Sequence, residues 1–183
     1  MPVYLALLRG INVSGKKIIK MEDLRKLMET LGYADVKTYI QSGNIIFSNP
    51  EGDKALIKKT IEEAIEKQYG FDVSVFVLDK DNLDKAVIHN PFTEGREEEA
   101  PGFKKLYVTF LSETPSDENM EKLLQCSIGD DLIEVIGDVL YFKLESKASD
   151  SKLSNNLIES KLKVRATTRN WNTTLKLLNM MEF

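Results

Sequence analysis

The stretch that decides the fold is Val36–Phe47, which reads VKTYIQSGNIIF. Two runs of β-branched and aromatic residues, Val36–Ile40 and Asn44–Phe47, flank the polar residues Ser42-Gly43-Asn44. Gly-Asn between two such runs is typical of a tight turn between antiparallel strands. The stretch therefore predicts a β-hairpin. The segments before and after this hairpin are assigned next.

The segments around the hairpin complete a βαββαβ order. A short apolar run, Val3–Leu8, predicts a buried strand, and apolar residues at helical spacing within Glu22–Leu31 predict a helix. After the hairpin, Asp53 is a good N-cap for a helix that runs to Tyr69 and is ended by Gly70. Phe71–Leu78 then predicts a strand, which gives the ferredoxin-like split βαβ arrangement.

The same order recurs in the second half of the chain. Lys105–Leu111 predicts a strand, and Thr114-Pro115-Ser116-Asp117 predicts a helix start with Thr114 as cap and Pro115 at the first helical position. Gly137-Asp138 splits a second hairpin. A helix is expected to begin at Asp150 or Ser151, followed by a strand at Val164–Thr167.

Each half is expected to end in an extra helix, the first over Asp79–His89 and the second after Asn170. We therefore predict an α+β protein of two tandem ferredoxin-like (βαββαβ) units. The expected boundaries are residues 1–78 for the first unit, 79–103 for a helix and acidic linker, and 104–183 for the second unit with its C-terminal helix. Glu97-Glu98-Glu99 and Pro101-Gly102 mark the linker.

The segment Leu7–Lys17, LLRGINVSGKK, is the first candidate for function. Its spacing matches the nucleotide-binding pattern G-x-x-x-x-G-K, but Lys17 stands where that pattern needs Ser or Thr for magnesium. No helix is expected to begin inside the loop, so a true P-loop is disfavoured. Two interpretations remain open: a connector with solvated lysines, or a different kind of anion site.

Composition limits the function classes. The chain has 183 residues, 42% hydrophobic and 30% charged, with a net charge of -4. No apolar run is long enough to span a membrane, and the N-terminus does not resemble a secretory signal. The single cysteine, Cys126, forms no internal disulfide, so we expect a cytoplasmic protein. The sequence predicts no oligomeric state.

Charge is unevenly distributed along the chain. Arg9–Lys20 holds four basic residues and no acid, and Lys161–Lys176 holds five and no acid. Such runs are usually solvated faces, yet they also suit a bound anion. Nucleic acid is an unlikely partner, because the net charge is negative and the aromatic residues of the expected strands do not form the RNA-binding pattern of RRM sheets.

Four stretches together resemble one bacterial protein family. They are LLRGINV at residues 7–13, YIQSGNIIF at 39–47, SKL at 151–153 and ATTRNWNT at 166–173. The chain resembles the family filed as domain of unknown function 1697, over essentially its whole length. The resemblance implies a small cytoplasmic bacterial protein of paired ferredoxin-like units, with no established activity. Two departures stand out: Ser14 replaces a usual glycine, and Lys147–Asp150 replaces a segment with glycines and an arginine.

The candidate ligand-binding residues are polar residues of these stretches together with the basic residues of the first loop. They are Arg9, Asn12, Lys16, Lys17, Gln41, Ser42, Asn44, Lys152, Arg169 and Asn170. Polar groups at strand ends and helix starts commonly form sites. A structural alternative stays open, in which Ser42 and Asn44 serve the turn and Asn170 caps the last helix.

Catalytic and metal chemistry have few candidates. The only histidine, His89, precedes Asn90-Pro91, and Cys126 has no histidine near it in sequence. No metal-ligand spacing occurs, so we expect neither a metal nor a redox cofactor. We predict a protein that binds a small phosphate- or carboxylate-bearing ligand in a cleft between the two units, with Arg9 and Arg169 as a clamp. The alternatives are an enzyme acting on such a molecule, or a protein-interaction module without a ligand.

Overall fold

A computed structural model describes residues 1–93, 105–126, 128–145 and 151–182. Residues 94–103 of the expected linker, with Glu97–Glu99 and Pro101-Gly102, and the segment Lys147–Asp150 lie outside the described residues. The chain divides into two compact units, the first formed by Met1–Asp84 with Lys176–Phe183 and the second by Lys85–Leu175. The division therefore falls inside two helices, and the end of the chain belongs to the first unit.

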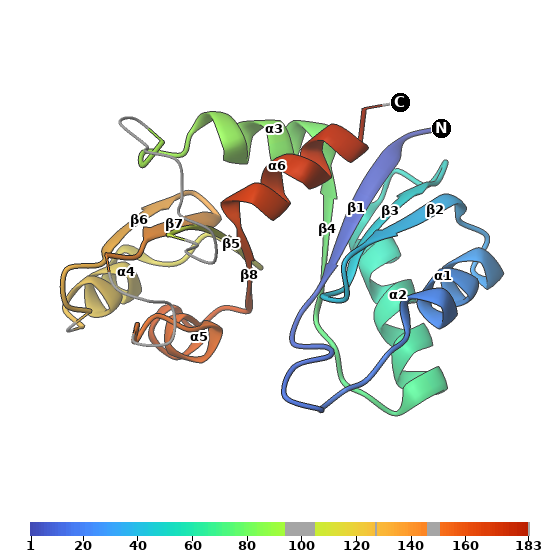
Figure 1. Ribbon diagram of the computed structural model, residues 1–183, viewed down its shortest axis with the longest axis horizontal. Coiled ribbons are helices and arrows are strands. Elements are labelled where there is room, and N and C mark those ends of the chain that lie inside the picture. Colours follow the sequence, from blue (N-terminus) through green and yellow to red (C-terminus); the bar gives the residue numbers. More distant parts are fainter. Residues whose placement is uncertain (94–104, 127, 146–150, 183) are drawn as a thin grey trace. The chain divides into compact units, whose positions relative to one another are not determined.

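The protein is α+β, with two four-stranded antiparallel sheets and six helices in the described part of the chain (Figure 1). The elements of the first half are β1 (Val3–Leu8), α1 (Met21–Thr30), β2 (Ala34–Tyr39), β3 (Asn44–Ser48), α2 (Lys54–Tyr69), β4 (Val75–Asp79) and α3 (Lys80–Ile88). Those of the second half are β5 (Leu106–Leu111), α4 (Asp117–Leu124), β6 (Leu132–Ile136), β7 (Val139–Lys143), α5 (Asn155–Leu162), β8 (Ala166–Asn170) and α6 (Trp171–Met180).

The first sheet has the strand order β2-β3-β1-β4, and all neighbouring strands are antiparallel. Helices α1 and α2 pack on one face of it (Figure 1). Alternate residues of β1 face these helices, so that Tyr4, Ala6 and Leu8 join a core with Leu24 and Ile61 of the helices. Leu5 and Leu7, which point to the opposite face, are also fully buried.

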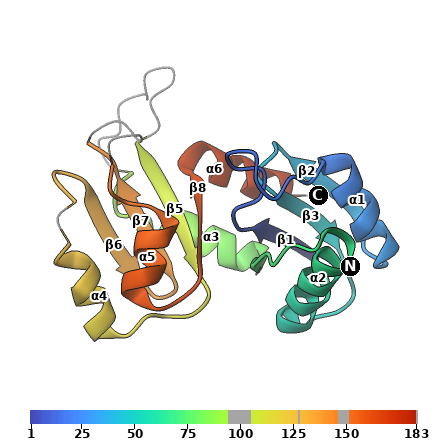
Figure 2. The same cartoon turned by 90° about the horizontal axis from the view of Figure 1, so that it is seen from below.

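The second sheet has the order β6-β7-β5-β8, again antiparallel throughout. Helices α4 and α5 cover one face, as Figure 2 shows from below. Its core contains Leu111, Leu140 and Phe142 of the strands with Leu123 and Ile158 of the helices. The two units therefore share one order of elements and one order of strands, which fits a tandem duplication.

Hydrogen bonds at matching places strengthen this likeness. The N–H of Leu8, the last residue of β1, donates to the carbonyl of Gly43, and Leu111 at the end of β5 donates to Asp138, over 2.9 Å in each case. Both acceptors lie in the hairpin turn between the second and third strands of their unit. The predicted hairpins at Gly43-Asn44 and Gly137-Asp138 thus occupy equivalent positions.

In both units, a glutamate of the second helix accepts a hydrogen bond from the first residue of the last strand. Glu62 of α2 accepts from the N–H of Val75 over 2.9 Å, and Glu159 of α5 accepts from the N–H of Ala166 over 3.1 Å. Val75 and Ala166 are the first residues of β4 and β8. The strand expected from Phe71 begins four residues later, at the point where Glu62 provides an acceptor.

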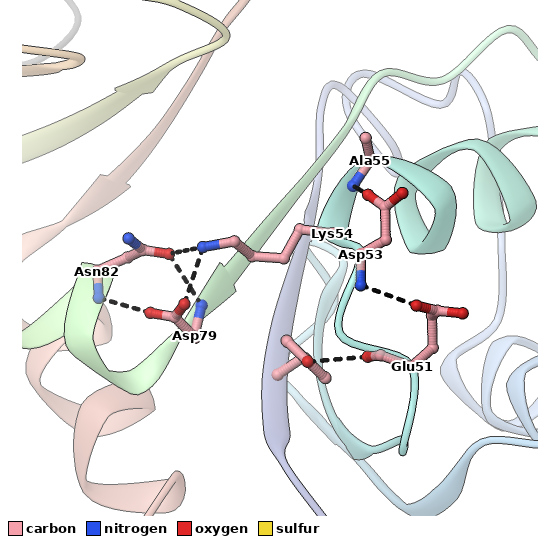
Figure 3. A network of polar contacts seen from close by, with 7 residues as sticks. Glu51, Asp53, Lys54, Ala55, Asp79 and Asn82 are labelled. Atoms are coloured by element: carbon pink, nitrogen blue, oxygen red, sulfur yellow. Dashed lines mark hydrogen bonds and ion pairs between the residues drawn. The ribbon is translucent and has the colours of Figure 1, made fainter.

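Each last strand passes directly into a helix through a side-chain cap. Asp79 Oδ1 accepts from the N–H of Asn82 over 2.8 Å, and Asn170 Oδ1 accepts from that of Thr173 over 2.9 Å. In the first unit Lys54 adds a second link, because its Nζ lies 2.8 Å from Asp79 Oδ2 and 2.7 Å from Asn82 Oδ1 (Figure 3). The helix expected after Asn170 is present.

Two expected helix starts are wrong. Helix α4 is capped by Ser116 rather than Thr114, since the Ser116 hydroxyl accepts from the N–H of Asn119. Helix α5 begins at Asn155 with Ser154 as its cap, four or five residues after the expected start. Ser151 is engaged elsewhere, because its hydroxyl donates to Asp131 Oδ2 over 2.8 Å. The same hydroxyl accepts from the N–H of Leu153 over 3.1 Å, so Ser151 orders the segment before α5 rather than the helix itself.

Candidate ligand-binding site

Asn12 fixes the shape of the loop between β1 and α1. Its Nδ2 donates to the carbonyls of Ile19, at 2.9 Å, and Gln41, at 2.7 Å, and its Oδ1 accepts from the N–H of Ile19 at 2.8 Å. The Asn12 backbone has a φ of 54°, a left-handed conformation that asparagine tolerates better than most residues. One side chain therefore ties the β1–α1 loop to the turn between β2 and β3.

Residues 12–17 form a small hairpin within this loop. The N–H of Asn12 donates to Lys17, and the N–H of Lys16 donates to Val13 over 2.9 Å. Ser14 and Gly15 at its tip both have positive φ, of 51° and 72°, as a type I′ turn requires. The glycine that the family resemblance led us to expect at position 14 would suit this backbone conformation better than Ser14 does.

The loop does not present a helix terminus to a ligand. Lys17 is followed by three residues before α1 begins at Met21, and Lys20 precedes the helix in an extended conformation. A P-loop needs the helix to begin at the phosphate-binding residues. The geometry is therefore that of a side-chain-braced hairpin with exposed lysines.

Gly43 brings the β2–β3 turn against the end of β1. Its φ is 80°, and a Cβ at this position would lie 2.7 Å from Cβ of Leu8 and 2.9 Å from Cδ1 of Ile11. Asn44, which is fully buried, donates from Nδ2 to the carbonyl of Tyr39 over 3.0 Å. Glycine is needed here for both conformation and space, and Asn44 has a structural part in closing the turn.

Ile40 carries backbone strain that the sequence did not suggest. Its φ is 50°, although a β-branched side chain strongly disfavours the left-handed region, and its side chain is 47% exposed. It stands between Tyr39, the last residue of β2, and Gln41, whose carbonyl accepts from Asn12. No local signal announces such a residue, since isoleucine in this place reads as a continuing strand.

The basic residues at this end of the first unit differ in exposure. Arg9 is half-buried, and its N–H donates to the carbonyl of Ser74 over 3.0 Å. Lys16 and Lys20 are exposed, while Lys17 Nζ donates to the carbonyl of Asp72. The segment just before β4 therefore lies beside the basic loop, a neighbour that sequence reasoning had not included.

Arg169 lies inside the second unit, on β8. It is 8% exposed, and its Nη1 donates to the hydroxyl of Thr167 and to the carbonyl of Thr168, each over 2.9 Å. Burial lowers the pKa of its guanidinium to about 10, so the group still carries its charge at neutral pH. Lys152 is exposed, and Asn170 is the cap of α6.

A partly buried chain of polar side chains next to Arg169 in the sequence has no counterpart in the other half of the protein. The hydroxyl of Thr168 donates to Asn155 Oδ1 over 2.7 Å and lies 2.8 Å from that of Thr109, which is therefore the donor between the two. The matching pair in the first sheet is Ala6 opposite Val77. Sequence reasoning did not single out Thr109 and Asn155. A comparison of matching positions in the two halves identifies the polar pair Thr109–Thr168, which Asn155 then extends.

The candidate residues therefore fall into two groups. Arg9, Asn12, Lys16, Lys17, Gln41, Ser42 and Asn44 gather at one end of the first sheet. Lys152, Arg169 and Asn170 belong to the second unit. The clamp of one anion by Arg9 and Arg169 stays a prediction.

His89 and Cys126, which were considered for catalysis, both lie just after the ends of helices. His89 is exposed just after α3, and Cys126 follows α4 with its thiol donating to the carbonyl of Lys122 at 3.4 Å. Within residues 1–93, 105–126, 128–145 and 151–182, no three His, Cys, Asp or Glu side chains come together as metal ligands. Over the same ranges, no helix has the length and apolar character needed to cross a membrane.

Comparison with known proteins gives a family and a solved structure. The family model described as "Protein of unknown function (DUF1697)" matches residues 1–141. The chain is also similar to the structure of conserved bacterial protein SP0830 from Streptococcus pneumoniae, at 24% sequence identity, with a TM-score of 0.75 and coverage of 99% of each chain. This likeness shows a shared fold. No curated protein sequence matches the chain.

Proposed function

Because the chain belongs to DUF1697, a family of unknown function, we propose a function from its own residues: it binds a small ligand that carries a phosphate or carboxylate group. The observation behind the proposal is the braced, acid-free loop Arg9–Lys20. Asn12 orders this loop before any ligand arrives, so little conformational entropy is lost on binding. Arg9 supplies a planar fork suited to a carboxylate or phosphate, and Lys16 and Lys20 supply mobile charges.

The test is a titration of the full chain, followed by amide NMR shifts, with inorganic phosphate, sugar phosphates, nucleotides and citrate as probes. Saturable shifts at residues 10–20 are expected. Arg9→Ala should weaken binding roughly tenfold to hundredfold, because a charged hydrogen bond contributes about 1.5–3 kcal/mol. Arg9→Lys should also weaken binding, because a lysine ammonium cannot make the two parallel hydrogen bonds of the planar guanidinium group.

Lys67→Ala is the matched control, because Lys67 is an exposed cation on α2 of the same unit. It should bind every probe as well as wild type. Arg169 is a poor first variant, since its buried side chain also holds Thr167 and its loss would disturb the fold. Unchanged affinity in Arg9→Ala, or a wild type that responds to no anion, would remove the proposal.

A second candidate function is a protein-interaction module, and one observation favours it. Three large apolar side chains of the same region are exposed: Val13 at 57%, Ile18 at 54% and Ile40 at 47%. Exposed apolar residues that cluster often mark a docking site. Variant Ile40→Ser separates the candidates, because Ile40 lies outside the loop Arg9–Lys20, so its replacement should leave anion affinity unchanged yet weaken a protein complex. An enzyme on the same anionic substrate would be recognised by turnover of a probe that binds.

We also propose that each unit is ferredoxin-like and that the two arose by duplication. The orders β2-β3-β1-β4 and β6-β7-β5-β8, with βαββαβ connections, support this proposal. The paired contacts of Glu62 with Val75 and Glu159 with Ala166 support a common ancestor more strongly than the strand order does. A cytoplasmic location remains our proposal from the single cysteine, and fractionation of the native host would test it.

A further inference from the structure

Strand β6 is an edge of the second sheet, and its free edge is regular. Among the described strands it pairs only with β7, in an unbroken register from Leu132 opposite Lys143 to Ile136 opposite Val139. Because the turn has two residues, Ile136 and Val139 form a hydrogen-bonded pair. Ile136, Glu134 and Leu132 therefore direct their backbone N–H and C=O groups toward β7, and the residues between them direct theirs away from β7. The N–H and C=O groups of Ile133 and Val135 therefore point outward, and no described residue outside the sheet ladder bonds to them.

Apart from the charge of Glu134, this edge lacks the protection that edge strands normally carry. Natural edges are guarded by lysine, proline or bulges that prevent pairing with another chain. The matching edge strand of the first unit, β2, has a register shift between Ala34 and Lys37, with Asp35 in a left-handed conformation. Strand β6 reads LIEVI, without Lys, Pro or a bulge.

The side chains of β6 divide between two environments. Ile133 and Val135 pack against the core of the second unit. Leu132 and Ile136 lie on the opposite face and are 46% and 39% exposed, with Glu134 exposed between them. The free edge therefore presents two outward backbone positions, flanked on one face by an apolar, an acidic and an apolar side chain.

The surroundings of β6 are acidic. Asp130, Glu134, Asp138 and Glu145 are all exposed within the segment 128–145, and Lys143 is the single basic residue there. Lys143 Nζ lies 3.7 Å from Glu145 Oε1, so its charge is already partly balanced. A partner strand with basic residues is favoured by this arrangement.

We propose that β6 binds an extended, basic segment of another protein, which adds a fifth strand to the second sheet. The partner carries the alternating pattern apolar-x-basic-x-apolar. Its backbone bonds to Ile133 and Val135, its Lys or Arg lies opposite Glu134, and its apolar residues cover Leu132 and Ile136.

A second copy of this chain fits the edge less well. In the fully overlapped antiparallel pairing about the centre of β6, Glu134 would lie opposite Glu134 of the other copy. Like charges directly opposite each other destabilise a strand pair. The charge of the edge therefore favours a different, basic chain over self-association.

The test uses the capped heptapeptide TVTKTVT as the probe, titrated into the full chain and followed by amide NMR shifts. The expected result is saturable shifts centred on Ile133 and Val135. The peptide TVTETVT should bind roughly threefold to fivefold more weakly. Glu134→Lys, an exposed substitution, should reverse this preference, which a general loss of structure would not do.

Backbone methylation of the peptide gives a control that leaves the protein unchanged. Methyl groups on the alternate peptide nitrogens that face β6 should abolish binding, whereas methyl groups on the other set should not. Shifts located elsewhere, no saturable shifts, or equal binding of both peptides by wild type would overturn the proposal. So would a concentration-dependent dimer, seen by sedimentation, that blocks the peptide and persists in Glu134→Lys.

Discussion

The side-chain amide of Asn12 lies 2.7 Å from the backbone oxygen of Gln41, 29 residues further along the chain. The same side chain also bonds to Ile19, so it joins both ends of the β1–α1 loop to the turn between β2 and β3. This hydrogen bond connects the basic loop to the strained turn at Ile40. Substitution of Asn12 therefore tests how much the bond contributes to stability.

Asn12→Ala should lower the free energy of unfolding by about 2–4 kcal/mol. Three hydrogen bonds are lost, at about 0.5–1.5 kcal/mol each, and alanine tolerates a φ of 54° poorly. Asn12→Gly removes the same bonds but fits the backbone, so it should be less damaging by about 1 kcal/mol. Urea unfolding of both variants measures this, and wild-type stability in Asn12→Gly would contradict the bracing role.

Gly43→Ala should be far more destabilising than Gly137→Ala. Both glycines have positive φ, at 80° and 61°, and alanine should cost about 1 kcal/mol at each for conformation alone. A Cβ at Gly43 also meets Leu8 at 2.7 Å, whereas none of the described atoms lies within 4 Å of a Cβ at Gly137. The overlap should add about 1–3 kcal/mol. Equal losses in chemical denaturation would mean that the turn can shift away from β1.

Ser14→Gly should stabilise the protein by about 0.5–1 kcal/mol, because glycine adopts the φ of 51° without steric cost. Ser160→Gly supplies the contrast, since Ser160 is an exposed residue inside α5 and glycine there should destabilise by a similar amount. Melting temperatures of the two variants should move in opposite directions. A lower melting temperature for Ser14→Gly would show that the serine side chain contributes to the loop.

Tyr141 should make the stability depend on alkaline pH. Burial, helped by the carboxylate of Asp138, raises the pKa of Tyr141 to about 12 from its ordinary 10.0. The folded state thus holds the proton more tightly, so the contribution of Tyr141 is complete below about pH 10 and is lost as the pH rises through about 12. Tyr141 also donates to the carbonyl of Ala86 over 2.7 Å.

The measurement compares wild type with Tyr141→Phe by urea unfolding at about pH 8 and about pH 11. The variant should be less stable by about 1–3 kcal/mol at the lower pH, where it leaves the Ala86 carbonyl without its donor. The gap should narrow at the higher pH. Arg169, whose lowered pKa acts with the opposite sign in this range, is present in both proteins and cancels in the difference. A constant gap would contradict the shifted pKa.

Features encoded by neighbouring residues could be predicted from the sequence. Asp53 caps α2, Gly70 ends it in a left-handed conformation, and both hairpins form at their Gly-containing turns. In each case the deciding interaction lies within a few residues, so one window of sequence contains the whole cause.

Features that depend on contacts between residues far apart in the sequence could not be predicted. Ser151 bonds to Asp131, twenty residues earlier in the chain, and α5 begins only at Asn155. Lys17 reaches the carbonyl of Asp72 across 55 residues. The positive φ of Ile40 opposes its own propensity, so the surrounding structure must impose it. The role of Asn12 as a brace likewise depends on the carbonyl of Gln41, which lies 29 residues away in the sequence.

The division of the chain inside α3 and α6 has a consequence for biosynthesis. Residues 176–182 belong to the first unit, where Met181 is buried and Glu182 lies 3.7 Å from Lys80. A chain that leaves the ribosome from its N-terminus completes all of Lys85–Leu175 before these residues appear. The unit that begins first is therefore finished last, and a nascent chain stalled before residue 176 would hold an unfinished first unit behind a second unit that already has all its residues.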